Sequence, residues 1–407
     1  MADSNRRSVI ITFKPKDQRP DKDKDKQEVL RDSVESKVQF LDAQALAAGA
    51  APLPSAPPET VGYDVNQYEA PILTASLTSS EIDALSANGN VESVEDDGEM
   101  WALEAIPSPV VGMQVEGQPS PQAETIPAGV SQVKAPLGWD CSRGKNVRVA
   151  VLDTGIDGSH PDLAPNYRRG VSFVAGEGSP VDGNGHGTHC AGTIAAAING
   201  AGVVGVAPTA FLFAVKVLSA SGSGAWSNLI AGIDWCITNK IRIVSMSLGA
   251  PSAPSAVETI CTTAWSKGLL LIAAAGNDGG PVGAPAKFDS VVAVSAIDSS
   301  NLLAPFSNRG PEVELCAPGV NVLSTLPGGT HGRLSGTSMA CPHVSGAAAL
   351  AWGGHRLSDN VTVRRLLART ADNLGIPGRD HNFGYGRVDA AQAACSLNEP
   401  RAIPGIP

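Results

Sequence analysis

From residue 146 onward, short apolar runs of strand length alternate with longer runs that have the character of helices. This alternation is typical of βαβ units, in which helices cover both faces of a parallel sheet. We therefore predict an α/β fold with a mostly parallel sheet for this part of the chain. The strand-like runs are NVRVAVLD, FLFAVKVL, IRIVSMSLG, LLLIAAAGN and VVAVSAID, and the helix-like runs are HGTHCAGTIAAAI, SNLIAGIDWCITN and PSAVETICTTAWSKG.

The first hundred residues have a different pattern. The strand-like stretches SVIITF, APILTASL and VESVED accompany one helix, whose start is marked by Thr78 to Ser80. The charged run at 16–27 and the Ala- and Pro-rich stretch at 47–59 are interpreted as loops. We predict a small α+β domain over residues 1–103.

A change in composition separates the two regions. Residues 104–123 carry four prolines together with glycine and glutamine, which is typical of a linker. The sequence therefore predicts a second domain at 124–400 and a C-terminal tail at 401–407.

Composition limits the classes of function. The 407 residues carry a formal net charge of −10, which argues against a general nucleic-acid binder. The longest apolar run, GLLLIAAAG at 268–276, is too short to span a bilayer, so we expect no membrane partner. The first residues, MADSNRRSVIITF, contain no apolar core of a secretory signal, and the seven cysteines contain no CxxC pair.

Several polar residues occupy places that a buried sheet would not choose. Asp153 ends one strand, Asn277 ends another and His186 begins a helix, and open α/β sheets bind ligands at the carboxyl ends of their strands. Ser338 lies in the stretch SGTSMACPHVSG, where glycines precede the apolar run of a helix. A serine hydroxyl becomes nucleophilic when a histidine takes its proton and a carboxylate stabilises the imidazolium. These residue types therefore predict nucleophilic acyl transfer.

The same residues allow other interpretations. Ser338 taken alone could be a helix cap. His186 and His189 form an HxxH pair that could indicate zinc, although the glutamate of HExxH and an obvious third ligand are missing. For His189 and His343 we expect structural hydrogen bonds and no direct chemistry.

Five segments in order resemble the subtilisin-like serine proteases, or subtilases, over roughly residues 124–395. The resemblance implies that Asp153 orients, that His186 acts as general base and then acid, and that Ser338 attacks the substrate carbonyl. It adds the side chain of Asn277 and the N–H of Ser338 as donors to the oxyanion. The segments are VAVLDTGIDGSHPDL, DGNGHGTHCAGTIAA, MSLGAPS, AAAGN and LSGTSMACPHVSGAAAL.

The resemblance also implies where a substrate binds. Two extended segments would flank a peptide as added strands, and a roomy pocket would take a large apolar side chain, such as Leu, Phe or Tyr, before the cleaved bond. Trp226 and Leu248 would shape a second apolar pocket or simply belong to the core. The flanking segments are Gly222, Ser223 and Gly224, and Ser247, Leu248 and Gly249; the pocket is formed by the wall Ala274 to Gly276 and by Gly283.

A structural Ca²⁺ site is implied in the same way, from an aspartate after HPD and a glycine-rich loop with an asparagine. Oxygen ligands from side chains and carbonyls suit this ion. Glu124 stands where the family often supplies an amide, and the alternative is that the NGAG sequence is merely a turn. The predicted ligands are the side chains of Asp162, Asn199 and Glu124 and the carbonyl oxygens of Ala197, Ala201 and Val203.

The N-terminal region resembles, more weakly, the inhibitor-I9-type propeptide of this family. Such a domain acts as a folding template and inhibitor, with its C-terminal tail in the substrate groove. The spacing implies self-cleavage after Leu103, with a later cleavage before Glu124; the alternative is an accessory domain that is never removed. We therefore expect a self-processing monomeric zymogen with protein or peptide substrates and its own propeptide as partner, secreted by family analogy.

The rival function from a different class is a non-catalytic peptide-binding protein that keeps the same groove. Cys190 and Cys341 are predicted to be buried apolar fillers near the site. Cys236 and Cys261, on helices expected to be neighbours, are predicted to form a disulfide. Pro342 is expected to lie close enough to a helix start for its missing N–H to be tolerated.

Overall fold

The computed structural model describes residues 6–33, 61–65, 72–103, 114–116, 123–355 and 358–396. Two compact units are formed by these residues: one comprises the residues up to 98 with 254–259, and the other comprises 99–253 with the residues from 260 onward. Most of the linker predicted at 104–123, and the whole of the predicted tail, lie outside the described residues.

The first unit is a four-stranded antiparallel sheet with the strand order β2-β3-β1-β4, accompanied by a helix at 79–86 and a helical stretch at 26–33. The helix at 79–86 begins with a capping box, in which Thr78 accepts the N–H of Glu81 and the Glu81 carboxylate accepts the N–H of Thr78. Ile11, Leu73 and Leu85 belong to the buried core. The predicted helix and the three predicted strands are confirmed. The elements are β1 Arg7–Phe13, a 3-10 turn Lys16–Gln18, β2 Val61–Val65, β3 Ile72–Leu77, α2 Ser79–Ser86 and β4 Val91–Asp96.

The second unit is built on a seven-stranded parallel sheet, in the order β15-β14-β13-β11-β7-β9-β8. All residues of β11, β13 and β14 are buried, as in a sheet that is covered on both faces. The predicted α/β fold with a parallel sheet is confirmed. The strands are β7 Arg148–Asp153, β8 Tyr167–Ser172, β9 Phe211–Lys216, β11 Ile243–Met246, β13 Leu270–Ala274, β14 Val291–Ile297 and β15 Val313–Pro318.

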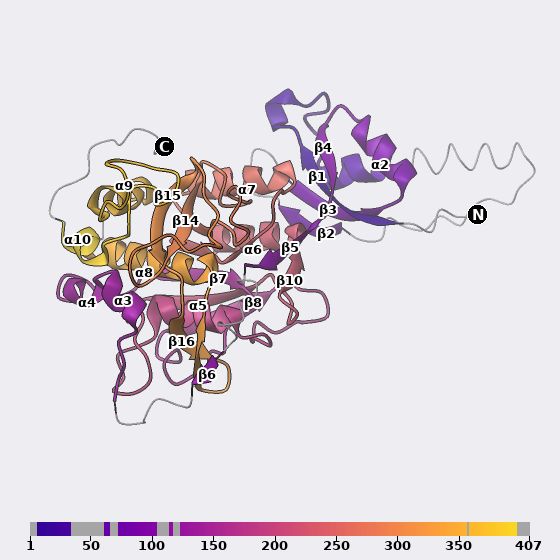
Figure 1. Ribbon diagram of the computed structural model, residues 1–407. Helices are drawn as coiled ribbons and strands as arrows, with labels where there is room; N and C mark the ends of the chain where they lie inside the picture. The colour runs from indigo at the N-terminus through magenta and orange to yellow at the C-terminus, as the bar shows by residue number, and fades with distance from the viewer. Residues whose placement is uncertain are drawn as a thin grey trace, which may run out of the picture. The chain divides into compact units, whose positions relative to one another are not determined.

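Helix α6 lies on one side of this sheet, and α5 and α8 lie on the other (Figure 1). Almost all of α8 is buried, which explains why its sequence is apolar on every side. Within the described residues, no helix is long and apolar enough to cross a membrane. The helices are α3 Ala128–Gln132, α4 Ala135–Gly138, α5 His186–Ala195, α6 Trp226–Thr238, α7 Ser255–Ser266, α8 Thr337–Gly354, α9 Asn360–Thr370 and α10 Ala390–Cys395.

Two small antiparallel sheets complete the second unit, in the orders β10-β5-β12 and β16-β17-β6. The hairpin of β16 and β17 leads directly into α8. The strands are β5 Glu99–Ala102, β6 Gln114–Glu116, β10 Ser223–Ala225, β12 Leu248–Gly249, β16 Val322–Leu326 and β17 Thr330–Leu334.

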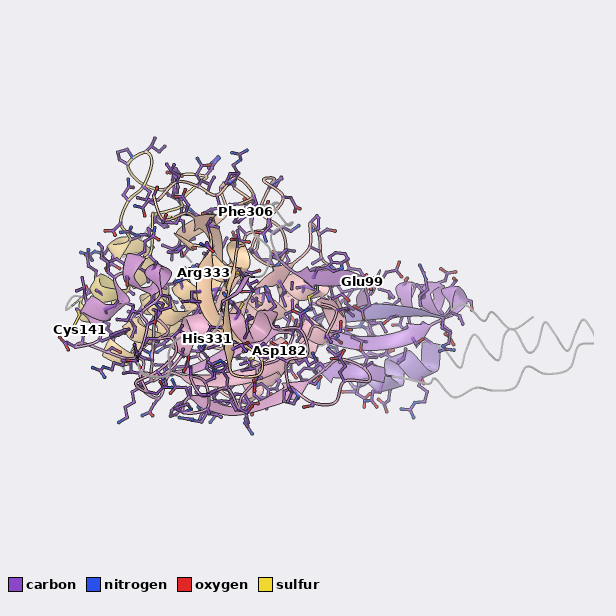
Figure 2. The ribbon with its side chains drawn as sticks, turned by 60° about the horizontal axis from the view of Figure 1, so that its bottom comes forward. Glu99, Cys141, Asp182, Phe306, His331 and Arg333 are labelled. Atoms are coloured by element: carbon purple, nitrogen blue, oxygen red, sulfur yellow. A yellow bond between two sulfur atoms is a disulfide. The ribbon has the colours of Figure 1, made fainter. Side chains whose placement is uncertain are left out.

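A disulfide joins Cys141 to Cys395, with a Cα–Cα distance of 5.4 Å across a sequence separation of 254. Cys141 lies at the opposite end of the second unit from Glu99, the first residue of β5 (Figure 2). The predicted pairing of Cys236 with Cys261 is wrong, because neither residue belongs to a disulfide. Both side chains are fully buried, on α6 and α7, as small apolar residues.

Candidate active site

Asp153 and His186 are brought together by the carboxyl end of β7 and the start of α5. The imidazole Nδ1 lies 2.8 Å from Asp153 Oδ1, and neither side chain is exposed to solvent. The same carboxylate oxygen accepts the N–H of Thr154 at 2.7 Å. When Nδ1 carries the proton of this pair, Nε2 is the basic nitrogen of the neutral imidazole.

The loop before α5 is organised by Asp182, a buried residue that the sequence did not single out (Figure 2). Its Oδ1 accepts the hydroxyl of Thr154 at 2.8 Å and the N–H groups of Asn184 and Gly185, both at 2.9 Å. Its Oδ2 accepts the N–H of Thr188 at 2.9 Å and the hydroxyl of the same residue at 2.6 Å. One carboxylate therefore fixes both the end of β7 and the first turn of α5. A DGNG sequence is also typical of an ordinary turn, so it gives no sign of this role.

Ser338 lies in the first turn of α8 and is fully buried. Its hydroxyl donates to two carbonyl oxygens, those of Leu103 at 2.7 Å and Ser247 at 3.0 Å. The carbonyl oxygen of Ser338 lies 3.5 Å from the Sγ of Cys190. The same Sγ lies within 4.8 Å of a carboxylate oxygen of Asp153 and of a ring nitrogen of His186. The structure thus brings Ser338 beside that pair, while its hydroxyl donates to the two carbonyl groups.

Pro342 lies beyond the first turn of α8. The expectation that its missing N–H is tolerated because it lies close to the helix start is therefore wrong. A proline at this place removes the N–H that would bond to the carbonyl of Ser338, four residues earlier. That carbonyl instead accepts the hydroxyl of Ser247 at 2.9 Å and the thiol of Cys190 at 3.5 Å. The lost helical bond is therefore replaced by side chains from the surroundings of the site.

Asn277 follows the end of β13 and has a fixed orientation. Its Oδ1 accepts the N–H of Thr337 at 2.8 Å and the hydroxyl of the same residue at 2.9 Å. Its Nδ2 is directed the other way and donates to the carbonyl oxygen of Leu103. The Leu103 carbonyl therefore receives hydrogen bonds from both Asn277 and Ser338.

The segments predicted to bind substrate flank a strand of this same chain. Strand β5 lies between β10 and β12 and pairs antiparallel with both, so it extends the pattern of backbone hydrogen bonds as an added peptide would. Opposite residues are Met100 and Gly224, Trp101 and Ser223, and Ala102 and Leu248; further bonds run from Ala102 N to Gly222 O at 2.8 Å and from Leu103 N to Ser247 O at 3.2 Å.

A cavity of about 530 Å³ lies beside Leu103, and its walls are mostly apolar. The predicted pocket residues Gly276 and Gly283 line this cavity, whereas Ala274 does not. A Cβ at Gly283 would lie 2.8 Å from a carbonyl oxygen of the wall, so glycine keeps this wall open. Asp278 adds a carboxylate to the lining that the sequence analysis missed.

Trp226 and Leu248 do not line this cavity. Their exposed fractions are 2% and 0%, so both belong to the buried core of the second unit. Met100, the β5 residue opposite Gly224, is also fully buried. The side chain two positions further along β5, Ala102, faces the same side of the strand.

The loop after α5 gathers the predicted calcium ligands. Glu124 Oε1 accepts the N–H groups of Asn199 at 2.6 Å and Gly200 at 2.9 Å. Asp162 accepts the Asn199 side-chain amide at 3.1 Å through Oδ1 and the N–H of Val203 at 2.8 Å through Oδ2. Two carboxylates and one amide therefore converge on a single loop.

The carbonyl groups of this loop differ in their partners. Those of Ala196 and Gly202 accept backbone N–H groups, from Gly205 at 3.0 Å and Thr125 at 2.8 Å. Three others accept no hydrogen bond within the described residues, which leaves oxygen atoms of the kind that Ca²⁺ prefers. The residues present therefore fit a calcium ion. These three carbonyl groups belong to Ala197, Ala201 and Val203.

His331 holds Asp162 from the side of β17, with Nε2 2.8 Å from Oδ2 (Figure 2). Burial alone would raise the pKa of Asp162, but the hydrogen bonds from His331 and its other donors hold this pKa below its usual value. The neighbouring His160 uses both ring nitrogens, because its Nδ1 accepts the N–H of Asp162 at 3.1 Å and its Nε2 donates to Thr330 O at 3.0 Å. Asp162 is thus kept ionised, as a cation ligand must be.

His189 and His343 bond to backbone groups, as expected. His189 Nε2 donates to Val322 O at 2.9 Å, and His343 Nδ1 donates to Met339 O at 2.8 Å. Burial lowers the pKa of His189 to about 3 and the pKa of His343 to about 4, so both are neutral at ordinary pH. Because His189 is directed at a carbonyl group, it does not combine with His186 in a metal site within the described residues.

Cys190 and Cys341 are buried thiols near Ser338, and the prediction that they fill apolar space is confirmed. Burial raises the pKa of Cys190 well above its usual value and raises the pKa of Cys341 to about 11. Neither thiol is therefore a reactive thiolate.

Comparison with known proteins agrees with this geometry. The Subtilase family matches residues 144–386. Subtilisin E of Bacillus subtilis (strain 168) is 51% identical over 279 residues, which cover 67% of this chain and 72% of that protein. The subtilisin of Bacillus pumilus is 49% identical over 279 residues, covering 67% and 100%, and an alkaline protease of Shouchella clausii is 43% identical over 325 residues, covering 79% of each.

The chain belongs to the subtilase family, whose α/β fold and parallel sheet it shares. Within that family it is a serine endopeptidase, a hydrolase that acts on proteins.

Proposed function

We propose that Asp153, His186 and Ser338 form a catalytic triad that hydrolyses peptide bonds through an acyl-enzyme. The observation that carries this proposal is the double contact on the Leu103 carbonyl oxygen, to which Ser338 Oγ and Asn277 Nδ2 both donate. A peptide carbonyl held by a hydroxyl nucleophile and an amide donor has the surroundings that acyl transfer requires.

In the proposed reaction, the Ser338 hydroxyl turns from its carbonyl acceptors towards His186 Nε2. His186 takes the proton as Ser338 Oγ attacks the carbonyl carbon, and returns it to the leaving amine when the C–N bond breaks. Water then gives a proton to His186 and attacks the ester, which releases the carboxylate product and restores the hydroxyl. Asp153 holds Nδ1–H and stabilises the imidazolium in both steps.

The negative charge on the carbonyl oxygen is stabilised by the Asn277 amide and by the N–H of Ser338. Because Oδ1 of Asn277 is fixed by Thr337, its Nδ2 needs no reorientation when charge develops. The backbone N–H of Ser338 belongs to the first turn of α8, where the helix dipole also favours negative charge.

The first bond cut in this proposal is the chain's own Leu103–Glu104 bond. Strand β5 pairs with β10 and β12 as an extended substrate would, and Leu103 lies beside the cavity. After cleavage, residues up to Leu103 would remain as an inhibitor that must leave before other substrates enter. We also predict a second cleavage before Glu124. The protein is predicted to be a monomer, in which one chain supplies every catalytic residue.

The cavity beside Leu103 favours a large apolar residue before the cleaved bond, because apolar groups dominate its walls. Asp278 is a carboxylate of the same lining and gives the pocket a secondary tolerance for lysine or arginine. Peptide anilides that differ only in this residue measure the preference through kcat/KM. A higher kcat/KM for Lys than for Leu would contradict it.

A calcium ion is proposed in the loop after α5, held by the side chains of Asp162, Asn199 and Glu124 and by the carbonyl oxygens of Ala197, Ala201 and Val203. The ion would neutralise the two carboxylates and bind the loop to the segment at Glu124. Its role in this proposal is structural, and no step of the reaction involves it.

A fluorophosphonate probe tests the proposed nucleophile. The purified wild-type chain should become labelled at Ser338 in peptide mapping, and Ser338→Ala should remain unlabelled. Labelling of the Ser338→Ala chain would identify a different nucleophile. No label on a folded wild-type chain whose first 103 residues have been removed by an added protease would favour the rival function, a peptide-binding protein without turnover.

A further inference from the structure

The amino ends of the sheet strands in the second unit carry a cluster of basic side chains. Arg148 is the first residue of β7 and Asp153 is the last, so five residue steps, or about 17 Å, separate the cluster from the proposed active site along this strand. Arg168 and Arg169 lie at the start of β8, and Arg242 precedes β11. We call this the basic cluster; its members are Lys145, Arg148, Arg168, Arg169, Lys240 and Arg242.

Contacts join the members of the basic cluster. Arg148 donates to the Asn239 carbonyl at 3.0 Å, Arg169 donates to the side chain of the same Asn239, and Lys240 is the next residue. Lys145 and Arg242 line one small hollow of about 200 Å³. The backbone N–H of Arg242 donates to Arg148 O at 3.1 Å, which connects the hollow to the arginines around Asn239.

Three of the arginines lie over aromatic rings. The guanidinium carbon of Arg168 lies 3.8 Å from the ring centroid of Phe211. For Arg169 over Trp235 the distance is 5.5 Å, and for Arg242 over Trp352 it is 5.0 Å. The rings hold the guanidinium groups in place, which reduces the entropy lost when they bind an anion.

The charges of the basic cluster can be compared with the ion pairs of the part of the chain that the structure describes. All six side chains are on exposed residues, and within the described residues none of the six takes part in an ion pair. The whole chain, in contrast, has a formal net charge of −10. A cluster of six unpaired cations in an acidic protein is a local field that attracts a polyanion.

We propose that the basic cluster binds an anionic polysaccharide that carries carboxylate or sulfate groups. Arginine forks match such groups with paired hydrogen bonds. One face of each aromatic ring of the cluster lies beneath a guanidinium group, so that face is not available for stacking by the bases of a single-stranded nucleic acid. The Cys141–Cys395 disulfide favours an oxidising compartment, where acidic polysaccharides are more accessible partners than nucleic acids.

Heparin, a sulfated polysaccharide, is the probe that tests this surface. The full-length chain with Ser338→Ala, which should not process itself, should bind heparin at 0.1 M NaCl and elute as salt screens the contact. Arg168→Glu and Arg242→Glu should each weaken binding about fivefold or more, and the two together should weaken it further. The matched control is Arg369→Glu, an equal change of charge at an exposed residue at the end of α9, which should change binding less than twofold.

Thermal unfolding of each variant separates loss of folding from loss of binding. Equal weakening by Arg168→Glu and Arg369→Glu would overturn the proposal, since only net charge would then matter. Absence of binding by the folded parent chain at 0.1 M NaCl would overturn it as well. Tighter binding to duplex DNA than to heparin of the same charge would overturn the choice of a polysaccharide.

Discussion

The carbonyl oxygen of Leu103 lies 2.7 Å from the hydroxyl oxygen of Ser338, although 235 positions separate the two residues in the chain. The same carbonyl accepts the Asn277 amide, and the strand that ends at Leu103 is paired on both edges. The segment Glu99–Ala102 therefore pairs with β10 and β12 as an added peptide strand would.

Replacing Asn277 with alanine should lower kcat much more than it changes KM, because the amide is proposed to act chiefly on charge that develops in the transition state. In subtilisin, a relative of this chain, loss of an oxyanion donor lowers kcat by about 10²–10³, and we expect the same order here. Steady-state kinetics on a short peptide substrate measures both constants. An unchanged kcat would mean that Asn277 holds only Thr337.

Asp182→Asn should lower kcat about tenfold, because an amide cannot accept all five hydrogen bonds that join β7 to α5. Loss of this buried negative charge should also move the acid limb of the kcat/KM profile to lower pH, since the imidazolium becomes less stable. Thr154→Ser, which keeps the hydroxyl donor, is the control. A variant with lower thermal stability but an unmoved pH profile would reduce Asp182 to a purely structural role.

Stability should fall as the pH is lowered from about 6.5 towards 4. His189 and His343 have pKa values of about 3 and about 4 in the folded chain but 6.5 when exposed, so the unfolded chain binds protons that the folded chain does not. Each histidine contributes a slope of about 1.4 kcal/mol per pH unit in this window. His343→Asn keeps a donor to Met339 O and should flatten the slope by one such amount in urea unfolding of the Ser338→Ala chain. An equal slope in both chains would contradict this origin of the pH dependence.

Calcium should raise the temperature of unfolding, and a chelator should lower it. An ion at a hundred times its Kd stabilises the folded state by about 2.7 kcal/mol. Asp162→Asn should abolish most of this shift in calorimetry of the Ser338→Ala chain. Asp157→Asn is the matched control, because its carboxylate caps Ser159 and Gly328 and is not a predicted ligand. If calcium still raised the unfolding temperature of Asp162→Asn by the same amount, the ion would have to bind at a different site.

The parallel sheet could be predicted from the sequence because its central strands are almost entirely apolar. VRVAVLD and LLIAA have no polar alternation, and both became buried parallel strands. Strand β8, with the sequence YRRGVS, was not predicted because it lies at the edge of the sheet, where its two arginines reach solvent. The pattern of apolar residues therefore identifies a strand most readily when both faces of the strand are buried.

Site residues could be predicted from the sequence where the residue type itself indicates a chemical role. They could not be predicted where the role depends only on which residues the fold brings together. Asp153, His186 and Asn277 stand at ends of elements, where polar residues are conspicuous. Asp182 was missed because its DGNG context is also that of an ordinary turn. The disulfide was missed because no local pattern relates Cys141 to Cys395 across 254 positions.

Mass spectrometry of freshly purified full-length chain and of its Ser338→Ala variant is the most direct measurement of the proposed triad. The wild-type chain should separate into a fragment that ends at Leu103 and a fragment that begins at Glu104, while the variant stays intact. Cleavage of the variant at the same bond, in the absence of any other protease, would contradict the assignment of Ser338 as the nucleophile.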